Sequence, residues 1–259
     1  MPVGKGGMTE LRGAAKSRFV RGMFAGVSPR YDLMNRLMTF GLDQGWRRRV
    51  VAEAAVPAAG RVLDVATGTG DIALAFRQPG PRGRGPGPED DERSVVGIDF
   101  CQPMLEVARE KAQQTSQATA GRVSPSFLAG DALALPFLDG AFAAVTSGFA
   151  MRNVADIQDA FSEMCRVTRP GGRVVCLEVA RPANAAVRFL HGVYFGRVVP
   201  LLGRLVSGQG AAYAYLPASA GRFPPPAELQ AIMERAGWSQ VRYILLGLGA
   251  VAIHVGVKV

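Results

Sequence analysis

The chain has little cysteine, and the few cysteines lie far apart. Only Cys101, Cys165 and Cys176 occur among 259 residues, with no C-x-x-C pair. A disulfide-stapled secreted domain or a cysteine-rich zinc site needs more cysteines at closer spacing. The cysteine content therefore argues against both classes and predicts a protein of a reducing compartment, the cytoplasm.

Long uncharged apolar runs are also missing. No stretch reaches the roughly 18 residues that a membrane-spanning helix needs. The segment 243–257 comes nearest, but it contains His254, and its Val, Ile and Gly content is typical of strands. The N-terminus has no apolar core of the signal-peptide kind. We therefore expect a cytoplasmic protein without a spanning helix.

Acidic residues are in the minority, with 21 Asp and Glu against 30 Lys and Arg and a net charge of +9. Such a surface attracts nucleic acids and anionic membranes. The arginines are not interleaved with aromatic residues, as they are where single-stranded bases stack, so we expect no nucleic-acid partner. A solvated basic surface accounts for most of the charge, and a peripheral contact with the inner face of the membrane is the functional alternative.

The stretch 61–71 carries a binding motif. The apolar segment 61–65 predicts a buried strand, which ends at Gly68-Thr69-Gly70, and a helix-compatible segment follows at 72–76. Glycines at a strand-to-helix turn let a ligand approach the backbone and the free amides of the first helical turn. The sequence therefore predicts a ligand site at this turn.

Two ligand classes use such a turn, and Asp64 helps to separate them. The turn fits the G-x-G-x-x-G/A pattern of dinucleotide sites, with Ala73 at the last position. Asp64, however, stands at the strand end, where a carboxylate would repel a pyrophosphate and attract a cation such as S-adenosylmethionine. The spacing Asp64-x-Ala66-x-Gly68-x-Gly70 resembles the acid-x-Gly-x-Gly-x-Gly signature of class I methyltransferases. The structural alternative is an ordinary corner with a capping acid.

Further polar groups follow the next predicted strands. Segment 95–99 ends in Asp99, where a carboxylate can accept hydrogen bonds from both ribose hydroxyls of adenosylmethionine or of NAD. Segment 123–129 leads to Asp131, which can accept from an adenine amino group. The predicted cofactor contacts are Asp64, Ala66, Gly68, Thr69, Gly70, Asp99, Phe100, Asp131, Ala132 and Gly148.

Strands and helices alternate along the chain, which predicts an α/β fold with a mostly parallel sheet and helices on both faces. Seven strands are expected, at 61–65, 95–99, 123–129, 142–147, 173–179, 241–246 and 250–257. Because only a short link joins the last two strands, at least one of them should be antiparallel. The pattern is that of a Rossmann-like class I methyltransferase with an antiparallel last strand.

The domain organisation is simple. We expect a flexible N-terminus at 1–18 and a single domain at 19–259. Within it, residues 19–51 have helical periodicity and should form a cap. The Pro- and Gly-rich segment 78–93 predicts a flexible insertion, to which we assign no function. Residues 182–222 are apolar but interrupted by arginines, as suits a lid over an apolar substrate.

Four segments match a known set of motifs. The first runs from Phe24 through Tyr31-Asp32 to Trp46, and the second is Arg166-Val-x-Arg-Pro-Gly-Gly-Arg173, continuing to Glu178. The shorter ones are Phe149-x-x-Arg152-Asn153-Val154 and Tyr213-x-Tyr215-Leu216. From about Phe19 to the C-terminus the chain resembles the ubiquinone/menaquinone biosynthesis C-methyltransferase family. The chain departs from the family pattern at four places. Many members have histidine at the position of Asp43, and glycine is common at that of Ala66. Asparagine is usual at the position of Asp131, and a more polar pair precedes Tyr213 where this chain has Ala211-Ala212.

The resemblance implies C-methylation of a prenylated quinol by adenosylmethionine, converting a demethylmenaquinol to a menaquinol. A prenylated methoxy-benzoquinol of ubiquinone biosynthesis is the alternative substrate. A ring carbon becomes nucleophilic when a neighbouring hydroxyl loses its proton. Arg152 would stabilise that phenolate, Asn153 would orient a hydroxyl or a water, and Tyr31 and Asp32 would assist proton transfer. The structural alternative for Arg152 is a salt bridge that caps a helix.

Two other function classes stay open. An RNA or protein methyltransferase would suit the basic charge. However, methyltransferases that act on amino groups commonly carry a Pro-Pro-aromatic segment where this chain has Gly-Phe-Ala-Met-Arg at 148–152. RNA cytosine C5 methyltransferases need a nucleophilic cysteine near that segment, and this chain has none there. A non-enzymatic binding module is disfavoured by the acids Asp64, Asp99 and Asp131. The oligomeric state is also open, with a homodimer as one alternative.

Overall fold

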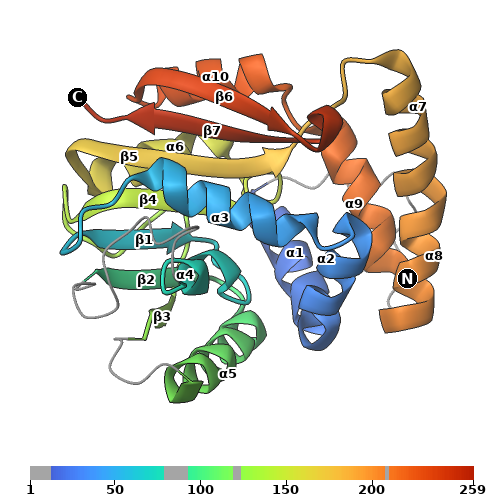
Figure 1. The fold of residues 1–259 in the computed structure, drawn as a ribbon, viewed down its shortest axis with the longest axis horizontal. Coiled ribbons are helices and arrows are strands. Elements are labelled where there is room, and N and C mark those ends of the chain that lie inside the picture. The colour runs from blue at the N-terminus through green and yellow to red at the C-terminus, as the bar shows by residue number, and fades with distance from the viewer. Residues whose placement is uncertain (1–12, 79–92, 119–123, 208–209) are drawn as a thin grey trace.

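The strands form one sheet, and the glycine turn leaves it near its middle. The computed structural model describes residues 13–78, 93–118, 124–207 and 210–259, so most of the predicted insertion at 78–93 lies outside the described residues. The sheet has seven strands in the order β3-β2-β1-β4-β5-β7-β6 (Figure 1). The strands are β1 Arg61–Val65, β2 Ser94–Asp99, β3 Ser126–Ala129, β4 Phe142–Gly148, β5 Thr168–Val179, β6 Ser239–Leu246 and β7 Val251–Val257.

The strand directions confirm the predicted fold. Only β7 runs against its neighbours β5 and β6, and every other pair is parallel. The link between β6 and β7 is the 3-10 helix η5 (Gly247–Gly249), which is too short for a parallel crossover. The strand order reverses between β1 and β4. In such a sheet a crevice opens beyond the carboxyl ends of these two strands.

Helices cover both faces of the sheet, and alternate residues of each strand pack on opposite layers. Helices α3 (Leu42–Ala54), α4 (Asp71–Ala75) and α5 (Gln102–Ala118) share a core with Val62 of β1. Helices α6 (Ile157–Val167) and α10 (Pro226–Arg235) share the other core with Leu63 and Val65. All three β1 residues are fully buried, and each such side chain contributes roughly 1.5–3 kcal/mol by leaving water.

Strand β5 begins earlier than the predicted residue 173. Thr168 already pairs with Phe142, and the next paired residues are Arg173 and Ala144, so the segment 169–172 forms a bulge. Gly171 has φ 73°, and a Cβ on Gly172 would come within 2.9 Å of the carbonyl oxygen of Ala143. The glycines therefore allow the close approach that starts the strand directly after α6.

The N-terminal helices differ from the prediction in two ways. Helix α1 (Gly13–Val27) includes residues 13–18, which we expected to be flexible. Lys16 holds this end in place, because its Nζ donates to the carbonyl of Val154 at 2.6 Å. The predicted cap at 19–51 also divides. Helices α1 and α2 (Tyr31–Thr39) lie beyond the strand ends, whereas α3 packs on the sheet through Val50 and Ala54.

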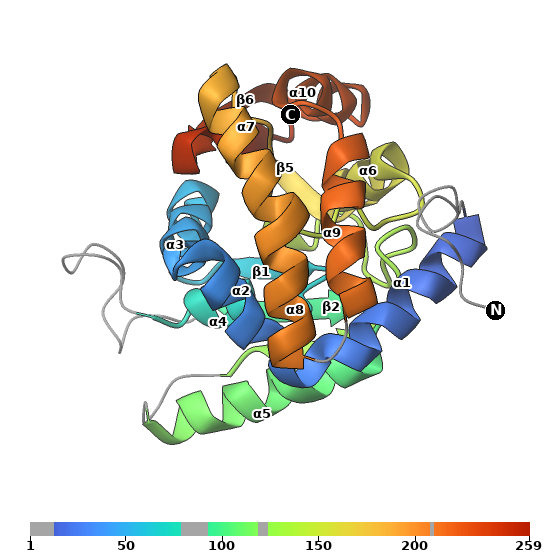
Figure 2. The same cartoon turned by 90° about the vertical axis from the view of Figure 1, so that its right-hand side faces the viewer.

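The segment 182–222, which we predicted to be a lid, is helical from Ala185 onward where it is described. It contains α7 (Ala185–Val193), the π-helix η4 (Tyr194–Val198), α8 (Val199–Ser207) and α9 (Gly210–Arg222). These helices gather with α1 and α2 at one end of the sheet (Figure 2). Met34 of α2 and Val199 of α8 are fully buried in their shared core. Within the described parts of the chain, no helix has both the length and the apolar character needed to cross a membrane.

Candidate active site

The loop after β1 adopts a left-handed backbone at three positions. Ala66, Gly68 and Gly70 have φ of 52°, 55° and 78°. A Cβ on Gly68 would meet nothing within 4 Å, so its backbone faces open space. A Cβ on Gly70 would lie 2.8 Å from the ring of Phe127, so this glycine is required by packing. Ala66 adopts the strained conformation with a side chain, at a cost of roughly 1–2 kcal/mol.

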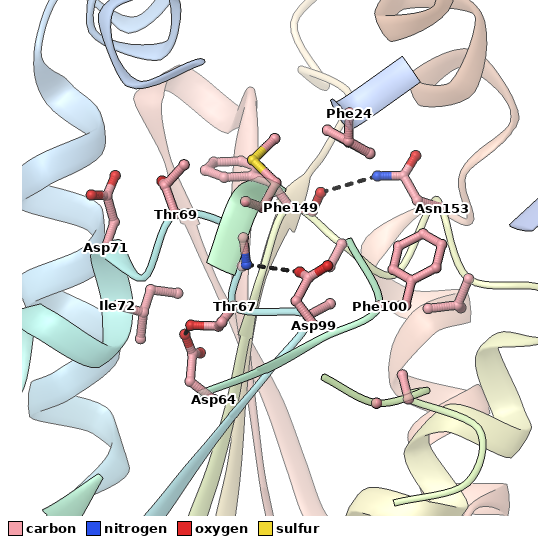
Figure 3. Close-up of a pocket in the computed structure, with 18 of the residues that line it drawn as sticks. Phe24, Asp64, Thr67, Thr69, Asp71, Ile72, Asp99, Phe100, Phe149 and Asn153 are labelled. Atoms are coloured by element: carbon pink, nitrogen blue, oxygen red, sulfur yellow. Dashed lines mark hydrogen bonds between the residues drawn. The ribbon is translucent and has the colours of Figure 1, made fainter. Parts of the chain in front are cut away.

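Two buried carboxylates flank this loop (Figure 3). Asp64 accepts hydrogen bonds from the hydroxyls of Thr67 at 2.6 Å and Thr146 at 2.7 Å. Asp99 accepts from the backbone amides of Gly68 and Cys101, both at 2.8 Å. Burial raises the pKa of Asp64 to about 6 and the pKa of Asp99 above its ordinary value, although these donors oppose the shift. Each carboxylate retains lone pairs for a ligand.

The loop and the strand ends line a first cavity of about 1000 Å³, including the space open to solvent. The structure brings nine of the ten predicted cofactor residues to this cavity: Asp64, Ala66, Gly68, Thr69, Asp99, Phe100, Asp131, Ala132 and Gly148. Gly70 is not among the lining residues and packs on Phe127 instead. Phe24 and Tyr31 close the cavity from the cap.

A second cavity, of about 1320 Å³ including the space open to solvent, lies under the cap helices and is lined mainly by apolar and aromatic side chains. It shares Phe24, Tyr31, Arg47, Phe149 and Asn153 with the first cavity, so the two spaces meet at these residues. Figure 3 shows Phe24, Phe149 and Asn153 grouped on one side of the loop. An acid-lined cavity that adjoins an apolar one can hold a cationic and an apolar ligand side by side.

A family model described as the ubiE/COQ5 methyltransferase family matches residues 12–258. The chain belongs to this family. A demethylmenaquinone methyltransferase of Roseiflexus castenholzii is 50% identical over 243 residues, which cover 94% of each chain. A demethylmenaquinone methyltransferase of Thermus thermophilus is 51% identical over 234 residues, which cover 90% of this chain and 99% of its own.

Solved structures agree on the fold. A Thermotoga maritima SAM-dependent methyltransferase, titled a possible histamine N-methyltransferase, aligns with a TM-score of 0.58 at 18% identity. The alignment covers 92% of this chain and 99% of that one. Fold and family together make this protein a class I methyltransferase with S-adenosylmethionine as its cofactor. The first cavity fits that molecule, because it offers two carboxylates for hydroxyl and cationic groups and an open backbone at Gly68.

In this methyltransferase, Arg152 lies in a buried ion pair. Its Nη1 is 2.7 Å from Oε1 of Glu178, and the two side chains are only 6% and 0% exposed. Burial raises the pKa of Glu178, and the charge of Arg152 opposes the shift. Nε of Arg152 has no hydrogen-bond partner among the described residues, and the side chain lines the second cavity. The pair joins the loop after β4 to β5 and caps no helix, unlike the structural alternative that we considered.

Asn153 and Tyr31, the other predicted catalytic residues, stand where the cavities meet. Asn153 donates from Nδ2 to the carbonyl of Phe149 at 3.4 Å and accepts from the hydroxyl of Tyr215 at 3.3 Å. Burial raises the pKa of Tyr31 above its ordinary value of 10.0, although the charge of Arg152 opposes the shift. Tyr31 is therefore a neutral hydroxyl at physiological pH, suited to orient a partner and unsuited to act as a base.

A charged network that the sequence did not reveal ties the cap to the cofactor loop. Asp32 accepts from the hydroxyl of Thr69 at 2.6 Å and pairs with Lys111 at 2.6 Å. Lys111 also pairs with Asp71, and Arg47 lies 3.0 Å from a second oxygen of Asp71. Asp32 lines neither cavity, and its part in proton transfer stays a prediction.

Arg47 is the cavity-lining residue that sequence reasoning most clearly missed. We assigned most of the basic charge to a solvated surface, but Arg47 is only 8% exposed and lines both cavities. It forms an ion pair with Asp43, which is 2% exposed. The spacing of four residues between this acid and arginine on one predicted helix was the signal that could have indicated the pair.

Proposed function

We propose that this chain transfers a methyl group from S-adenosylmethionine to a ring carbon of a demethylmenaquinol, giving a menaquinol. The observation that carries the proposal is the junction of the two cavities at Phe24, Tyr31, Phe149 and Asn153. The names of the relatives, demethylmenaquinone methyltransferases that match most of this chain, support the substrate.

The first cavity would hold the cofactor through its strand-end acids. Asp99 would accept from the ribose hydroxyls, and Asp131, beside Phe100 and Ala132, would accept from the adenine amino group. Asp64 would face the cationic end of the molecule near Gly68 and Gly148. When bound, adenosylmethionine supplies an electrophilic methyl group. The protein's part is to place that group at the junction and to keep water away from it.

Arg152 would stabilise the quinol while its ring is activated. A ring carbon attacks more readily when a neighbouring hydroxyl has lost its proton, and the guanidinium of Arg152, whose side chain lines the second cavity, would donate to that phenolate oxygen. A guanidinium is a poor base, so the proton has to leave through another group. Asn153 would orient a hydroxyl or a water there, and Tyr31, as a neutral hydroxyl, would help to fix the same oxygen.

The apolar second cavity suits the charge change of the reaction. Methyl transfer to a phenolate cancels opposite charges, and a dry site favours that step over solvation of the separate ions. The helices of 182–222 would act as the lid over the prenylated substrate, together with the helix that carries Tyr31. Because such a substrate resides in the bilayer, we also propose that the protein works in peripheral contact with the inner face of the membrane.

The direct test is a methyl-transfer assay with isotopically labelled adenosylmethionine. Purified protein should label a demethylmenaquinol, and mass spectrometry should place the methyl group on a ring carbon. A prenylated methoxy-benzoquinol in parallel distinguishes the two quinol substrates. Cells that lack the protein should accumulate the demethylated quinone. Label in RNA or protein with none in either quinol would refute the proposal.

A further inference from the structure

The outer side of the cap carries a stripe of exposed apolar and arginine side chains. Helices α7 and α8, joined by η4, form a nearly continuous rod across the cap (Figure 2). Leu190, Val193, Arg197, Leu201 and Arg204 follow one another along it at helical spacings of three and four and are all exposed. Leu190 and Leu201 are 66% and 56% exposed. On the opposite side, Tyr194 and Phe195 are half-buried against the cap and Val199 is fully buried in it, so the stripe faces outward.

The same apolar surface continues around the opening of the second cavity. Phe40 follows α2 and Leu42 begins α3, and both line that cavity while being 80% and 55% exposed. Phe40 also lies against Tyr194 of η4, at 5.8 Å between ring centroids. We call the exposed apolar residues of this surface the rim: Phe40, Leu42, Phe189, Leu190, Val193, Leu201 and Leu248. Exposed apolar groups gathered at a cavity opening indicate an interaction surface.

The charges beside the rim have one sign. The segment 181–227 contains no Asp or Glu, and Arg188, Arg197 and Arg204 are exposed on it. The acids of the neighbouring α2 and the start of α3 are already engaged, because Asp32 pairs with Lys111 and Asp43 with Arg47. A partner for this surface should therefore be apolar at its centre and anionic around it.

We propose that the rim docks on a bilayer that contains anionic lipid, with the apolar side chains between the headgroups and the arginines at the phosphates. The second cavity then opens toward the acyl chains, so the quinol ring can enter while its prenyl tail stays in lipid. The entry of a prenylated quinol from the bilayer rests on the proposed function, whereas the binding of the rim to the bilayer does not. A second copy of the chain is a poorer partner, because a symmetric contact would bring the arginines of both rims together.

Vesicle co-sedimentation tests the docking without catalysis. The full chain should bind phosphatidylcholine vesicles that contain phosphatidylglycerol at low salt, and bind pure phosphatidylcholine vesicles weakly. Phe189→Glu/Leu190→Glu should weaken binding roughly tenfold or more, because both side chains would meet lipid and neither lines either of the two cavities described above. Leu138→Glu is the matched control, because Leu138 is 84% exposed just before β4, at the opposite end of the strands.

The arginines are tested separately. Arg197→Gln and Arg204→Gln should each weaken binding to anionic vesicles by about fivefold and reduce its salt dependence. The exposed Arg169, at the amino end of β5, is the control position for an Arg→Gln change. Equal binding of wild type and Phe189→Glu/Leu190→Glu would overturn the proposal. The proposal would also be overturned if the wild type bound no vesicles and sedimentation velocity showed that it forms a dimer, which the double variant does not form.

Kinetics separate this inference from the proposed function. Turnover of a tailless quinol in solution should be the same in Phe189→Glu/Leu190→Glu and wild type. Turnover of a prenylated quinol carried in vesicles should fall about tenfold in the variant, mainly through KM. If the wild type methylates no quinol, but Phe189→Glu/Leu190→Glu still weakens vesicle binding, the proposed function is refuted and the docking surface stands.

Discussion

Replacing Arg152 separates the structural and catalytic parts of the buried ion pair. Arg152→Ala removes the guanidinium 2.7 Å from Glu178, whose side chain is fully buried. Glu178 keeps backbone donors, the amides of Val179 and of residue 152. Removing one partner of a buried pair costs roughly 3–5 kcal/mol. We expect about 3 kcal/mol in the free energy of unfolding, because those amides still satisfy part of the carboxylate.

The loss of stability should depend on pH. Burial raises the pKa of Glu178, and the charge of Arg152 is the main influence that opposes this shift. In Arg152→Ala that charge is gone, and the pKa of Glu178 should rise further. Below the unfolded-state pKa of about 4.3, Glu178 is protonated in both states and adds no penalty. As the pH rises above that value, only the unfolded state ionises easily and the fold is destabilised. Denaturant unfolding should therefore show a gap between variant and wild type that widens from pH 5 to pH 8.

Arg152→Ala/Glu178→Gln isolates the catalytic part. The amide has nearly the shape of the carboxylate and no charge, so most of the lost stability should return. Turnover should stay lower by roughly 10²–10³-fold with cofactor affinity unchanged, since a preorganised charge partner of the phenolate is missing. Arg152→Lys should restore only part of the turnover, because an ammonium cannot reproduce the guanidinium fork. Near-normal turnover in the stable double variant would show that Arg152 is purely structural.

Three further changes address the cofactor cavity. Asp99→Ala should weaken adenosylmethionine binding by roughly 1.5–3 kcal/mol in calorimetry, the usual cost of hydrogen bonds to a charged acceptor, and an unchanged Kd would remove Asp99 as the ribose acid. Asp64 has a raised pKa of about 6, so its carboxylate is protonated below that pH and cofactor affinity should rise from pH 5 to 7. Asp64→Asn should bind weakly with a flat pH profile, and a profile like that of wild type would contradict the assignment. Thr69→Val removes the hydroxyl that donates to Asp32 at 2.6 Å and should speed cofactor release about tenfold in stopped flow, whereas Thr69→Ser should not. Equal release rates would mean that this contact does not hold the cap closed.

The cofactor cavity was largely predictable because its parts follow one another along the chain. Asp64, Asp99 and Asp131 each stand at or just after the end of a parallel strand, and parallel strands bring such ends to one edge of a sheet. Ala66 shows where motif reading is weaker. Its φ of 52° is the conformation that favours glycine, and the structure keeps this geometry despite the substitution.

The charge pairs could not be predicted in the same way. Arg152 and Glu178 are 26 positions apart, Lys111 and Asp71 are 40 apart, and Lys111 and Asp32 are 79 apart. Their meeting depends on how the cap sits on the sheet, which no local pattern encodes. The second cavity was hidden for the same reason, since α2, α7 and the β6–β7 turn reach it from distant parts of the chain.

The pairing of Arg152 has a physical rationale in the proposed reaction. Methyl transfer removes the negative charge of the ring oxygen, so a partner that held the phenolate too strongly would favour the ground state over the transition state. Glu178 accepts from Nη1 of Arg152, whereas the buried Nε has no hydrogen-bond partner in the part of the chain that the structure describes. Because Glu178 partly neutralises it, the guanidinium would offer the substrate a donor of moderated charge. On this reasoning Glu178 is a positioning residue, which holds the guanidinium of Arg152 beside the second cavity and limits how tightly the phenolate is held.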